Sequence, residues 1–372
     1  MPSEPRVVAV TGANGFIGRN LVVRLNERGL AVRSILRETA PEEARRALSE
    51  ADIVFHLAGA NRPPKPTHFM RDNRDYTTAV AGIIAASGRK PVLIYCSSTK
   101  ATDDSEYGRS KRAGESELLG LAMRGAADVA IYRLPNIFGK WARPDYNSAV
   151  ATFCFNIARN LPIRIDDRDA PLALIHVDDV IDQWLSLLDE PLRQSGFVTP
   201  HGFYRTTVGQ VVDLINAFAE KRSAGEILAV GTGLERALYS TFIASLPANG
   251  FSYPLAAHSD LRGSFTEVLK TPASGQISVF NAHPGVTRGG HYHHAKVEKF
   301  LIVHGHARFR FRHILSGDTH EVLTSADTPV VVETIPGWTH DVTNVGDEVM
   351  VSLVWANEVF EPARPDTVAM PV

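Results

Sequence analysis

One short segment near the start of the chain limits what the rest can fold into. An apolar run at 7–10 is followed at once by the letters TGANGFIG and then by an amphipathic stretch at 16–28. Gly12, Gly15 and Gly18 would permit a tight turn, let the backbone approach a pyrophosphate, and let a helix pack closely on a strand. The N-terminus of that helix would then face the phosphate charge. In this strand–turn–helix context the pattern predicts a dinucleotide-binding unit, an ordinary Gly-rich turn being the alternative.

The first two thirds of the chain alternate short β-rich runs with helical patterns. Strands are predicted at 7–10, 31–36, 53–57, 92–96 and 129–134. Helices are predicted at 16–28, 77–86, 107–123, 149–160, 177–188 and 208–219. Strict alternation of strand and helix predicts a parallel sheet covered on both faces, that is, an α/β Rossmann-type domain.

The character of the sequence changes after about Ser245. From Gly263 onward, short apolar runs alternate with Gly and Pro, as in FTEVLK, QISVFNA, KFLIVHG, ARFRFRHI, TPVVVETI and VMVSLVWA. Strands of this length at regular spacing predict an all-β sandwich or barrel. We therefore predict two domains, at residues 1–245 and 246–372, with the boundary in the segment from Pro247 to Pro254.

Composition narrows the class of protein. The 372 residues are 44% hydrophobic and 22% charged, as in globular proteins, and the net charge of −2 favours neither a nucleic-acid nor a membrane partner. No apolar run approaches the roughly 18 residues of a membrane span. Cys96 and Cys154 lie far apart, which argues against a disulfide framework and for a reducing compartment, so we expect a cytoplasmic protein. A homodimer is the commonest oligomer and is our expectation here.

The end of the second predicted strand bears on the choice of cofactor. An acidic residue there would bind the ribose hydroxyls of NAD, whereas Arg37 could pair with the 2′-phosphate of NADPH. Glu38 is adjacent and could act in the opposite sense. We expect NADPH, with a solvent-exposed arginine of no such role as the alternative. The residues expected to bind the cofactor at this end of the sheet are Gly12, Gly15, Phe16, Ile17, Gly18 and Arg37.

The segment YGRSK predicts an acid–base pair on a helix. Tyr107 and Lys111 are four residues apart and would share one helix face. A free tyrosine, with a pKa of about 10, is a poor acid–base group at neutral pH, and a nearby ammonium favours its phenolate. Ser98 ends the fourth predicted strand and could hydrogen-bond a substrate hydroxyl or carbonyl. The Y-x-x-x-K spacing alone also occurs by chance in amphipathic helices, and its position after the Gly-rich turn is what favours catalysis.

Histidines in the C-terminal part have the spacing of a metal site. HYHHAKVE contains H-x-H-x4-E, and PGWTHDVTN supplies a later histidine. His291 and His293 would point to the same face of a strand. With Glu298 and His340 they form a ligand set suited to Zn²⁺ or another borderline divalent ion. A β-bulge would let His294 replace His293, and a metal-free pocket in which the histidines line a sugar site is the alternative.

Residues 1 to about 240 resemble the extended short-chain dehydrogenase/reductases that act on nucleotide sugars. The resemblance rests on the Gly-rich turn, Ser98 and YGRSK, together with FHLAG, RLPNIFG and HVDDV. It implies that Ser98, Tyr107 and Lys111 form a catalytic triad and that Lys111 also binds the nicotinamide ribose. It further implies contacts with the cofactor or the substrate for Leu57, Ala58, Asn136 and His176.

Two features depart from most epimerases and dehydratases of that family. The stretch between Ser98 and Tyr107 is much shorter than in most of them. Family 4,6-dehydratases carry an acidic pair after the Ser/Thr, whereas this chain has Thr99 and Lys100. Both features argue against dehydration and for simple reduction.

Residues 250 to about 365 resemble the cupins, on the motifs HYHHAKVE and PGWTH. Together with FSYPL and DLRGSFTEVLKT, the two halves are similar over nearly the whole chain to the CapF-type family of capsular-polysaccharide enzymes. That resemblance implies a bifunctional enzyme on the route to UDP-N-acetyl-L-fucosamine. The cupin would epimerise C3 of UDP-2-acetamido-2,6-dideoxy-hexos-4-ulose. The reductase would then reduce the C4 ketone with NADPH to UDP-2-acetamido-2,6-dideoxy-L-talose.

The implied chemistry is coherent, because a C4 ketone acidifies the C3 proton for removal and return on the other face. The base remains open, with His294, Tyr292 and Lys299 as candidates by location. Two other functions compete: a nucleotide-sugar 4-epimerase or dehydratase with an inert cupin, and an NADP-sensing regulator built on a decayed reductase. The intact Tyr107 and Lys111 argue against decay.

Overall fold

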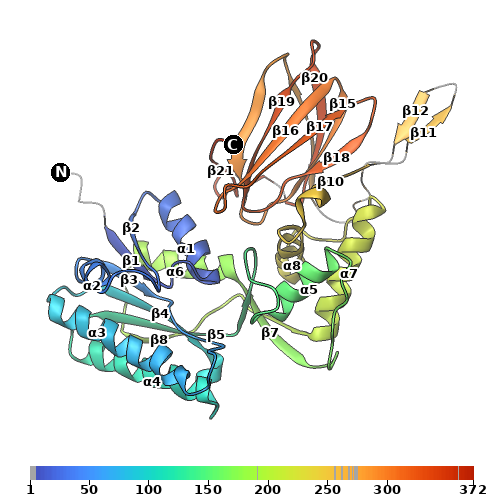
Figure 1. Cartoon of the computed structure of the whole chain (residues 1–372). Coiled ribbons are helices and arrows are strands. Elements are labelled where there is room, and N and C mark those ends of the chain that lie inside the picture. Colours follow the sequence, from blue (N-terminus) through green and yellow to red (C-terminus); the bar gives the residue numbers. More distant parts are fainter. Residues whose placement is uncertain are drawn as a thin grey trace, which may run out of the picture. The chain divides into compact units, whose positions relative to one another are not determined.

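The computed structural model describes residues 6–190, 192–254, 257–260, 263–266, 269, 271, 275–358 and 360–372 (Figure 1). The chain divides into two compact units. The first unit comprises Met1–Phe138, Asp145–Ser148 and Leu172–Arg205, and the second comprises Gly139–Pro144, Ala149–Pro171 and Thr206–Val372. Helices between residues 206 and 243 therefore group with the C-terminal strands. The predicted domain boundary between 245 and 246 stays a prediction.

A six-stranded parallel sheet forms the centre of the first unit. Its strand order is β2-β1-β3-β4-β5-β8, and the pairings along it are parallel. The predicted α/β Rossmann-type architecture is confirmed. Periodicity did not predict β8 because that strand has only 3 residues. The strands are β1 (Val7–Thr11), β2 (Ala31–Ile35), β3 (Ile53–His56), β4 (Val92–Ser98), β5 (Asp128–Leu134) and β8 (Gly196–Val198).

Apolar side chains alternate along these strands and supply a core on each face of the sheet. Val8 and Val10 pack with helices α1 and α6, whereas Ala9 and Val54 pack with α2, α3 and α4. Successive side chains of a strand point to opposite faces, so both faces need a cover. Figure 1 shows helices on both sides of this sheet. The helices are α1 (Phe16–Glu27), α2 (Pro41–Ser49), α3 (Tyr76–Ser87), α4 (Glu106–Met123) and α6 (Val177–Asp189).

Shorter elements connect these helices and strands. A π-helix, η1 (Met70–Asp75), leads directly into α3, and a 3₁₀-helix, η2 (Thr99–Thr102), follows β4. A separate three-stranded sheet has the order β6-β7-β9. Its strands are β6 (Asn136–Phe138), β7 (Pro171–His176) and β9 (Tyr204–Thr207).

A buried histidine joins the strand ends beneath the Gly-rich turn. His56 Nδ1 lies 2.8 Å from the Thr11 hydroxyl, and its Nε2 lies 2.9 Å from the Thr77 hydroxyl. The Thr77 hydroxyl donates in turn to the Asn73 carbonyl. Burial, and then the Lys111 ammonium, lower the pKa of His56 to about 3. The neutral ring therefore links β1, β3 and α3 through hydrogen bonds that satisfy both of its nitrogens.

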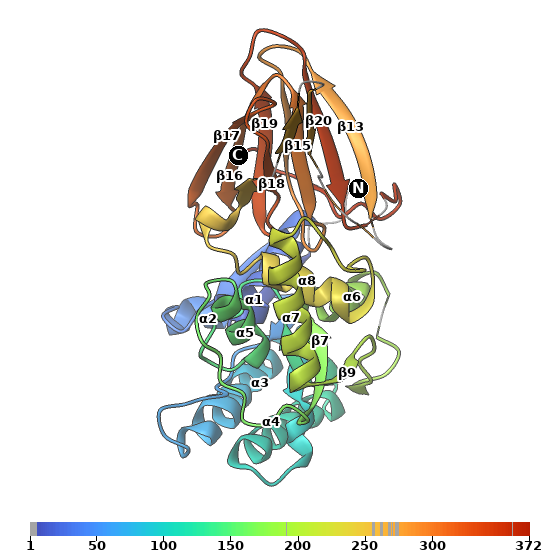
Figure 2. The same cartoon turned by 90° about the vertical axis from the view of Figure 1, so that its right-hand side faces the viewer.

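Two antiparallel sheets form the β-rich part of the second unit (Figure 2). One has the order β10-β18-β15-β20-β13 and the other β17-β16-β19-β14-β21. The predicted all-β C-terminal domain is confirmed. The first sheet consists of β10 (Ser252–Pro254), β13 (Gln276–Ala282), β15 (Glu298–His304), β18 (Val330–Glu333) and β20 (Met350–Ala356). The second consists of β14 (Thr287–Tyr292), β16 (His306–His313), β17 (Thr319–Ser325), β19 (Trp338–Asn344) and β21 (Val368–Ala369).

Among its described residues, the second unit also contains three α-helices, a 3₁₀-helix and a two-stranded ladder. The helices are α5 (Ala149–Ile157), α7 (Val208–Ser223), α8 (Gly233–Ile243) and η3 (Ala248–Gly250). Strands β11 (Ala257–Asp260) and β12 (Gly263–Thr266) pair antiparallel. Of the predicted strand FTEVLK, the part beyond Thr266 lies mostly outside the described residues. Among the helices in the described ranges, none is both long and apolar enough to cross a membrane.

A buried ionic cluster fixes α7 to the first of these sheets. Glu333 of β18 is fully buried and pairs with Lys299 of β15 and with Arg222 of α7. Burial opposes the charged carboxylate, but the two cations hold the pKa of Glu333 below its ordinary value. Removing one member would leave an uncompensated buried charge, which typically costs roughly 3–5 kcal/mol. The cluster explains why α7 groups with the strands of the second unit.

Replacement of His56 by Gln should change how stability depends on pH. The unfolded state takes up a proton near the ordinary histidine pKa, while the folded state resists protonation down to about pH 3. Below the ordinary histidine pKa the unfolded state therefore binds more protons than the folded state. As the pH falls from 7 to 4, this difference lowers the free energy of unfolding by ~3 kcal/mol. Urea unfolding at several pH values should show a shallower acid loss in His56→Gln than in the wild type. Parallel pH profiles for the two proteins would contradict the buried neutral assignment.

Candidate functional site

The Gly-rich turn packs too tightly for side chains. Gly12 has a φ of 68°, in the left-handed region, and its amide donates to the Ile35 carbonyl at 2.9 Å. A Cβ on Gly12 would lie 2.9 Å from the Ala58 backbone, and one on Gly18 would collide with the Gly12 carbonyl. Glycine is therefore required at both positions for steric reasons. The turn brings Ala58, an expected cofactor neighbour, against Gly12.

The N-terminus of α1 is available to an anion. Gly15 is its N-cap residue, and within the described part of the chain no side chain caps the helix there. The first turn of α1, which includes the expected cofactor residues Phe16 and Ile17, contains no acidic side chain. The amides and the helix dipole at this end suit a phosphate group. The residues present thus fit the pyrophosphate of a dinucleotide.

Arg37 lies at the same edge of the sheet. Ile35 pairs with Thr11 at the carboxyl ends of β2 and β1, so Arg37 follows β2 just beside the Gly-rich turn. Both Arg37 and Glu38 are exposed, which leaves either free to meet a ligand from solvent. The position is consistent with the expected contact to a 2′-phosphate, and that contact stays a prediction.

The three residues of the expected triad come together at the end of β4. Ser98 is the last residue of β4, and its side chain lies near the Tyr107 hydroxyl, where it acts to lower the pKa of the tyrosine. Burial raises the pKa of Tyr107, and the Lys111 ammonium offsets part of that rise. The Tyr107–Lys111 spacing predicts that the ammonium brings the tyrosine pKa toward neutrality. In the structure burial outweighs that effect, so the hydroxyl is held protonated and is suited to donate a proton.

Lys111 is buried and held in one place by two contacts. It is 6% exposed, its ammonium donates to the Cys96 carbonyl at 2.7 Å, and it lies 4.3 Å from the centre of the Tyr95 ring. Burial opposes its charge, but Tyr95 and Tyr107 raise the pKa of Lys111. A permanently charged ammonium next to Tyr107 can stabilise a phenolate and a bound ribose hydroxyl.

Two networks that the sequence analysis missed support this group. Asn73 of η1 donates to the Ala60 carbonyl at 3.0 Å and to the Ser110 hydroxyl at 2.9 Å, and accepts from the Ala60 amide at 2.8 Å. It thereby joins the loop after β3 to the turn of α4 between Tyr107 and Lys111. The π-helix η1 has only 6 residues, too few for a periodic sequence pattern, so Asn73 carried no signal.

Glu115 forms the second network, on α4 one turn beyond Lys111. It accepts from the Ser97 hydroxyl at 2.5 Å and from both arms of the Arg133 guanidinium at 2.9 and 2.5 Å. The carboxylate is 2% exposed. These bonds tie α4 to β4 and β5 immediately beside Ser98, which keeps the serine and the tyrosine at a fixed separation.

The two residues expected to meet the substrate lie on the small sheet. Asn136 begins β6, is exposed, and donates to the Ala173 carbonyl at 3.4 Å. His176 ends β7 and is only 2% exposed, with its ring against Phe138 at 5.4 Å between centroids. Asn136 is accessible to a ligand, whereas His176 forms part of the support for α6, whose N-cap it is. Substrate contact for either residue stays a prediction.

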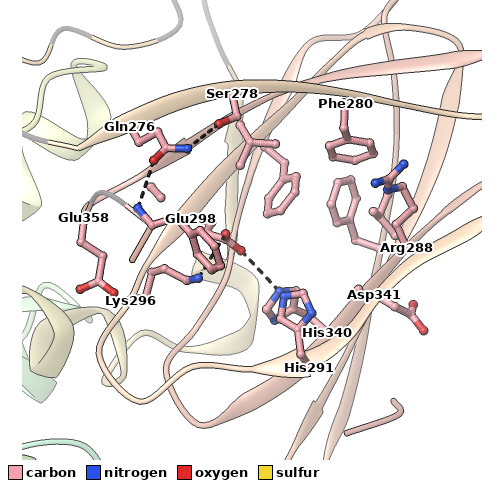
Figure 3. A pocket seen from close by; sticks show the side chains of 17 residues that line it. Gln276, Ser278, Phe280, Arg288, His291, Lys296, Glu298, His340, Asp341 and Glu358 are labelled. Carbon is pink, nitrogen blue, oxygen red and sulfur yellow. Dashed lines mark hydrogen bonds and ion pairs between the residues drawn. The ribbon is translucent and has the colours of Figure 1, made fainter. Parts of the chain in front are cut away.

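The four expected metal ligands converge in the second unit. The donor atoms of His291, His293, Glu298 and His340 all lie within 4.8 Å of one another. Glu298 Oε2 is 3.1 Å from His293 Nε2 and 3.7 Å from His340 Nε2. Figure 3 shows Glu298, His291 and His340 turned toward one another across the pocket. Three imidazoles and a carboxylate at these separations fit a divalent transition metal.

The protonation of the group suits a metal as well. Burial, and then His340 and His293, lower the pKa of His291 to about 4. Burial opposes the charge of Glu298, but the hydrogen bond to His293 and the nearby His340 ring hold its pKa well below the ordinary value. Neutral imidazoles and an ionised carboxylate are the ligand forms that a metal requires.

The structure distinguishes His293 from His294 by geometry. His291 is on β14, whereas His293 lies just beyond the end of that strand, and both side chains still point into the same group, as expected. The ladder does carry a register shift, between Gly289 and His291. His293 Nδ1 contacts the Asp366 carbonyl at 2.5 Å, which turns its Nε2 toward Glu298. His294 lies outside the group of four.

A cavity of about 330 Å³ opens beside this group, between the two sheets. His291, Glu298 and His340 line one part of it, and Lys296 lies next to them. Aromatic side chains make up much of the remaining wall. They are Phe280, Phe300, Phe309 and Phe360.

Comparison with known proteins follows the same division of the chain. Residues 8–198 match the family described as NAD dependent epimerase/dehydratase family, and residues 258–368 match the polysaccharide biosynthesis C-terminal domain. The crystal structure of the capsular polysaccharide assembling protein CapF from Staphylococcus aureus is 41% identical, with a TM-score of 0.68, over 98% of this chain and 100% of that chain. This chain belongs to the CapF-type branch of the NAD dependent epimerase/dehydratase family.

Other relatives agree with this membership. A UDP-2-acetamido-2,6-beta-L-arabino-hexul-4-ose reductase of Pseudomonas aeruginosa is 48% identical over 366 residues, 98% of each chain. The structure of the UDP-glucose 4-epimerase of Thermotoga maritima aligns with a TM-score of 0.51 over 57% of this chain and 82% of that chain. At 21% identity, this similarity indicates only that the two share a fold. The chain is therefore an enzyme of the CapF-type family, and membership supports a nicotinamide cofactor.

We expect the His293→Ala variant to lose its metal and the His294→Ala variant to keep it. His293 contributes a nitrogen to the group, whereas His294 is a neighbour of similar burial outside it. Protein purified without chelator or affinity tag should contain about one divalent ion per chain in the wild type and in His294→Ala. Elemental analysis and thermal melting with and without chelator give the readout. Equal metal content in the two variants would refute the assignment.

Proposed function

We propose that the chain is a bifunctional nucleotide-sugar enzyme. The second unit epimerises C3 of UDP-2-acetamido-2,6-dideoxy-hexos-4-ulose. The first unit then reduces the C4 ketone to UDP-2-acetamido-2,6-dideoxy-L-talose, on the route to UDP-N-acetyl-L-fucosamine in capsule or O-antigen synthesis. The observation that carries the proposal is that a Ser98–Tyr107–Lys111 group and a His–Glu cluster beside a cavity occur in the same chain. That chain is 48% identical over 98% of its length to a keto-sugar reductase.

The reductase step uses the group at the end of β4. NADPH, when bound along Gly12, Leu57 and Ala58, supplies a hydride to C4. Tyr107 donates its proton to the oxygen of the reduced carbon, and Ser98 orients that oxygen through its own hydroxyl. Lys111, fixed by the Cys96 carbonyl, holds the ribose of the cofactor and stabilises the phenolate that Tyr107 leaves.

The metal of the second unit is proposed to be zinc. Its ligands would be His291, His293, Glu298 and His340. The metal would either cross-link the strands that carry these ligands or act as a Lewis acid next to the cavity. Its ligands come from β14, β15, β19 and the loop after β14. A tie between such separated segments would stabilise the second unit.

We further propose a cytoplasmic homodimer with domains at 1–245 and 246–372. Two unpaired cysteines suit a reducing compartment. Ile277 and Val279 are 64% and 63% exposed on β13, an edge strand of its sheet. An apolar edge of this kind is normally covered, and a second copy of the chain is the simplest cover.

Product analysis tests the proposed function directly. The full chain is incubated in D₂O with the 4-keto UDP sugar, with and without NADPH, and products are followed by NMR. We expect deuterium at C3 without cofactor, and the 4-hydroxy sugar with stoichiometric loss of reduced cofactor when NADPH is present. Redox-neutral turnover of a 4-hydroxy UDP sugar, supplied in a parallel reaction, would instead indicate a 4-epimerase or dehydratase, and no turnover of either sugar would favour a sensor.

Replacing Tyr107 by Phe should abolish reduction while leaving cofactor binding nearly intact. The hydroxyl is the proposed proton donor and fills little volume, and acid–base groups are typically worth about 10²–10⁴-fold. Tyr132→Phe, in the core of the first unit, is the matched control and should reduce normally. Cofactor oxidation and cofactor titration are measured for both. A Tyr107→Phe rate above about a tenth of wild type would remove this tyrosine from its role.

Replacing Arg37 by Ala should weaken binding of NADPH more than that of NADH, because only NADPH carries the 2′-phosphate. Arg33→Ala, which removes an exposed arginine from β2 itself, is the control and should affect both cofactors equally. Dissociation constants from titration of each variant provide the comparison. Equal losses of the two cofactors in Arg37→Ala would show that this arginine does not contact the phosphate.

A further inference from the structure

The cavity beside the His–Glu cluster has one cation next to the cluster. Lys296 lies in the turn between β14 and β15 and is 7% exposed. Its ammonium donates to the Thr367 hydroxyl at 2.8 Å and lies 4.0 Å from Glu298 Oε1. Figure 3 shows Lys296 and Glu298 side by side at one end of the pocket. The lysine thus lines the cavity, and its ion pair with Glu298 is a long one of 4.0 Å.

The backbone of Lys296 is held as firmly as its side chain. Its amide donates to Asp366 Oδ2 at 2.7 Å, and the amides of His294 and Ala295 donate to the same carboxylate at 2.8 and 2.7 Å. Asp366 and Thr367 belong to one C-terminal segment. That segment therefore fixes both ends of Lys296, which is the arrangement expected of a preorganised binding group.

The other charged groups of the cavity are engaged elsewhere. Glu358 pairs with Arg236 at 3.3 Å, and Asp341 pairs with Arg310 at 2.5 Å. Arg288 is exposed, donates to the Asn281 carbonyl and lies by Phe280, away from Glu298 in Figure 3. Lys296 is the cation placed to meet an anionic oxygen next to the cluster.

Three residues, His294, Tyr292 and Lys299, are candidates for the epimerisation base by their location in the sequence. In the structure they lie outside the lining of the cavity. Lys299 is committed to the buried pair with Glu333. Tyr292 is 1% exposed and its ring packs against His294. Among the described residues that line the cavity, none of these three occurs, whereas Lys296 does.

Glu298 presents different oxygens to different partners. Its Oε2 lies by His293 and His340, while its Oε1 is the atom nearest Lys296. A ligand oxygen that approaches the ammonium from the cavity would meet the nitrogen of Lys296 without displacing the imidazoles from Glu298 Oε2. This arrangement separates a fixed hydrogen-bond donor from the metal-binding atoms.

We propose that Lys296 is a catalytic residue of the C3 epimerisation, whose ammonium binds the C4 carbonyl oxygen and stabilises the enolate. This inference rests on the proposed function. A general base removes the C3 proton, the C–H electron pair forms the C3=C4 bond, and the carbonyl pair moves to O4 beside Lys296. A proton then adds to C3 on the opposite face, and the carbonyl reforms. The lysine keeps its proton throughout and supplies charge and one hydrogen bond.

Exchange at C3 tests this role independently of reduction. The full chain is mixed with the 4-keto UDP sugar in D₂O without nicotinamide, and deuterium at C3 is followed by NMR. We expect Lys296→Met to exchange about 10²–10³-fold more slowly than wild type, as on loss of an oxyanion-stabilising donor. Lys296→Arg, which keeps the charge, should retain more exchange than Lys296→Gln. Thr367→Val should slow exchange less than Lys296→Met. It removes the hydrogen bond that positions the ammonium but leaves the ammonium itself in place.

Two controls separate catalysis from structure. Arg288→Met removes the other cation of the cavity and should leave exchange at saturating substrate unchanged. Metal content, thermal midpoint and NADPH-dependent reduction of the already epimerised ketone should be unchanged in Lys296→Met. If that variant does not fold, the difference between the Arg and Gln variants decides the question.

The outcomes distinguish failure of the inference from failure of the proposed function. Absence of exchange in wild type would overturn the proposed epimerisation. Normal exchange in wild type together with equal exchange in Lys296→Met would overturn the role of Lys296 alone. Equal exchange by the Arg and Gln variants would also overturn it, since the charge would then be dispensable.

Discussion

The close approach of three backbone segments at the first βα turn is the constraint on which the first unit depends. Gly12 lies against Ala58 at the end of β3, and Gly18 lies against the Gly12 carbonyl, with no room for a methyl group at either place. This contact brings the carboxyl ends of β1 and β3 to the N-terminus of α1. In a parallel sheet β4 ends at the same edge, so Ser98, Tyr107 and Lys111 stand beside the same opening.

The second unit depends on contacts between distant segments instead. Asp366 accepts three backbone amides and contacts His293 through its carbonyl, so the C-terminal segment positions both a metal ligand and Lys296. The pair of Glu333 with Lys299 and Arg222 fixes α7 to the strands. Both devices bury charge, and each is stable only because every partner is present. A metal would add a third tie across the same strands.

Local patterns predicted much of this arrangement because they report on short-range physics. The alternation of strands and helices predicted the parallel sheet, and H-x-H-x4-E with His340 predicted the four residues whose donor atoms converge beside the cavity. His293 lies just beyond the end of β14, where its contact with Asp366 orients its ring. Asn73 and Glu115 went unnoticed because neither belongs to a motif and both act through partners far along the chain.

The sequence by itself determined the fold class, the Gly-rich turn, the Tyr107–Lys111 spacing and the metal-type ligand set. Each of these depends on residue type and on separations of a few residues, which backbone geometry converts directly into position. Tertiary structure decided which histidine joins the cluster, that burial outweighs Lys111 in setting the Tyr107 pKa, and that Lys296 rather than Lys299 lines the cavity. Those outcomes depend on burial and on long-range partners, which exist only once the sheets have closed around the side chains.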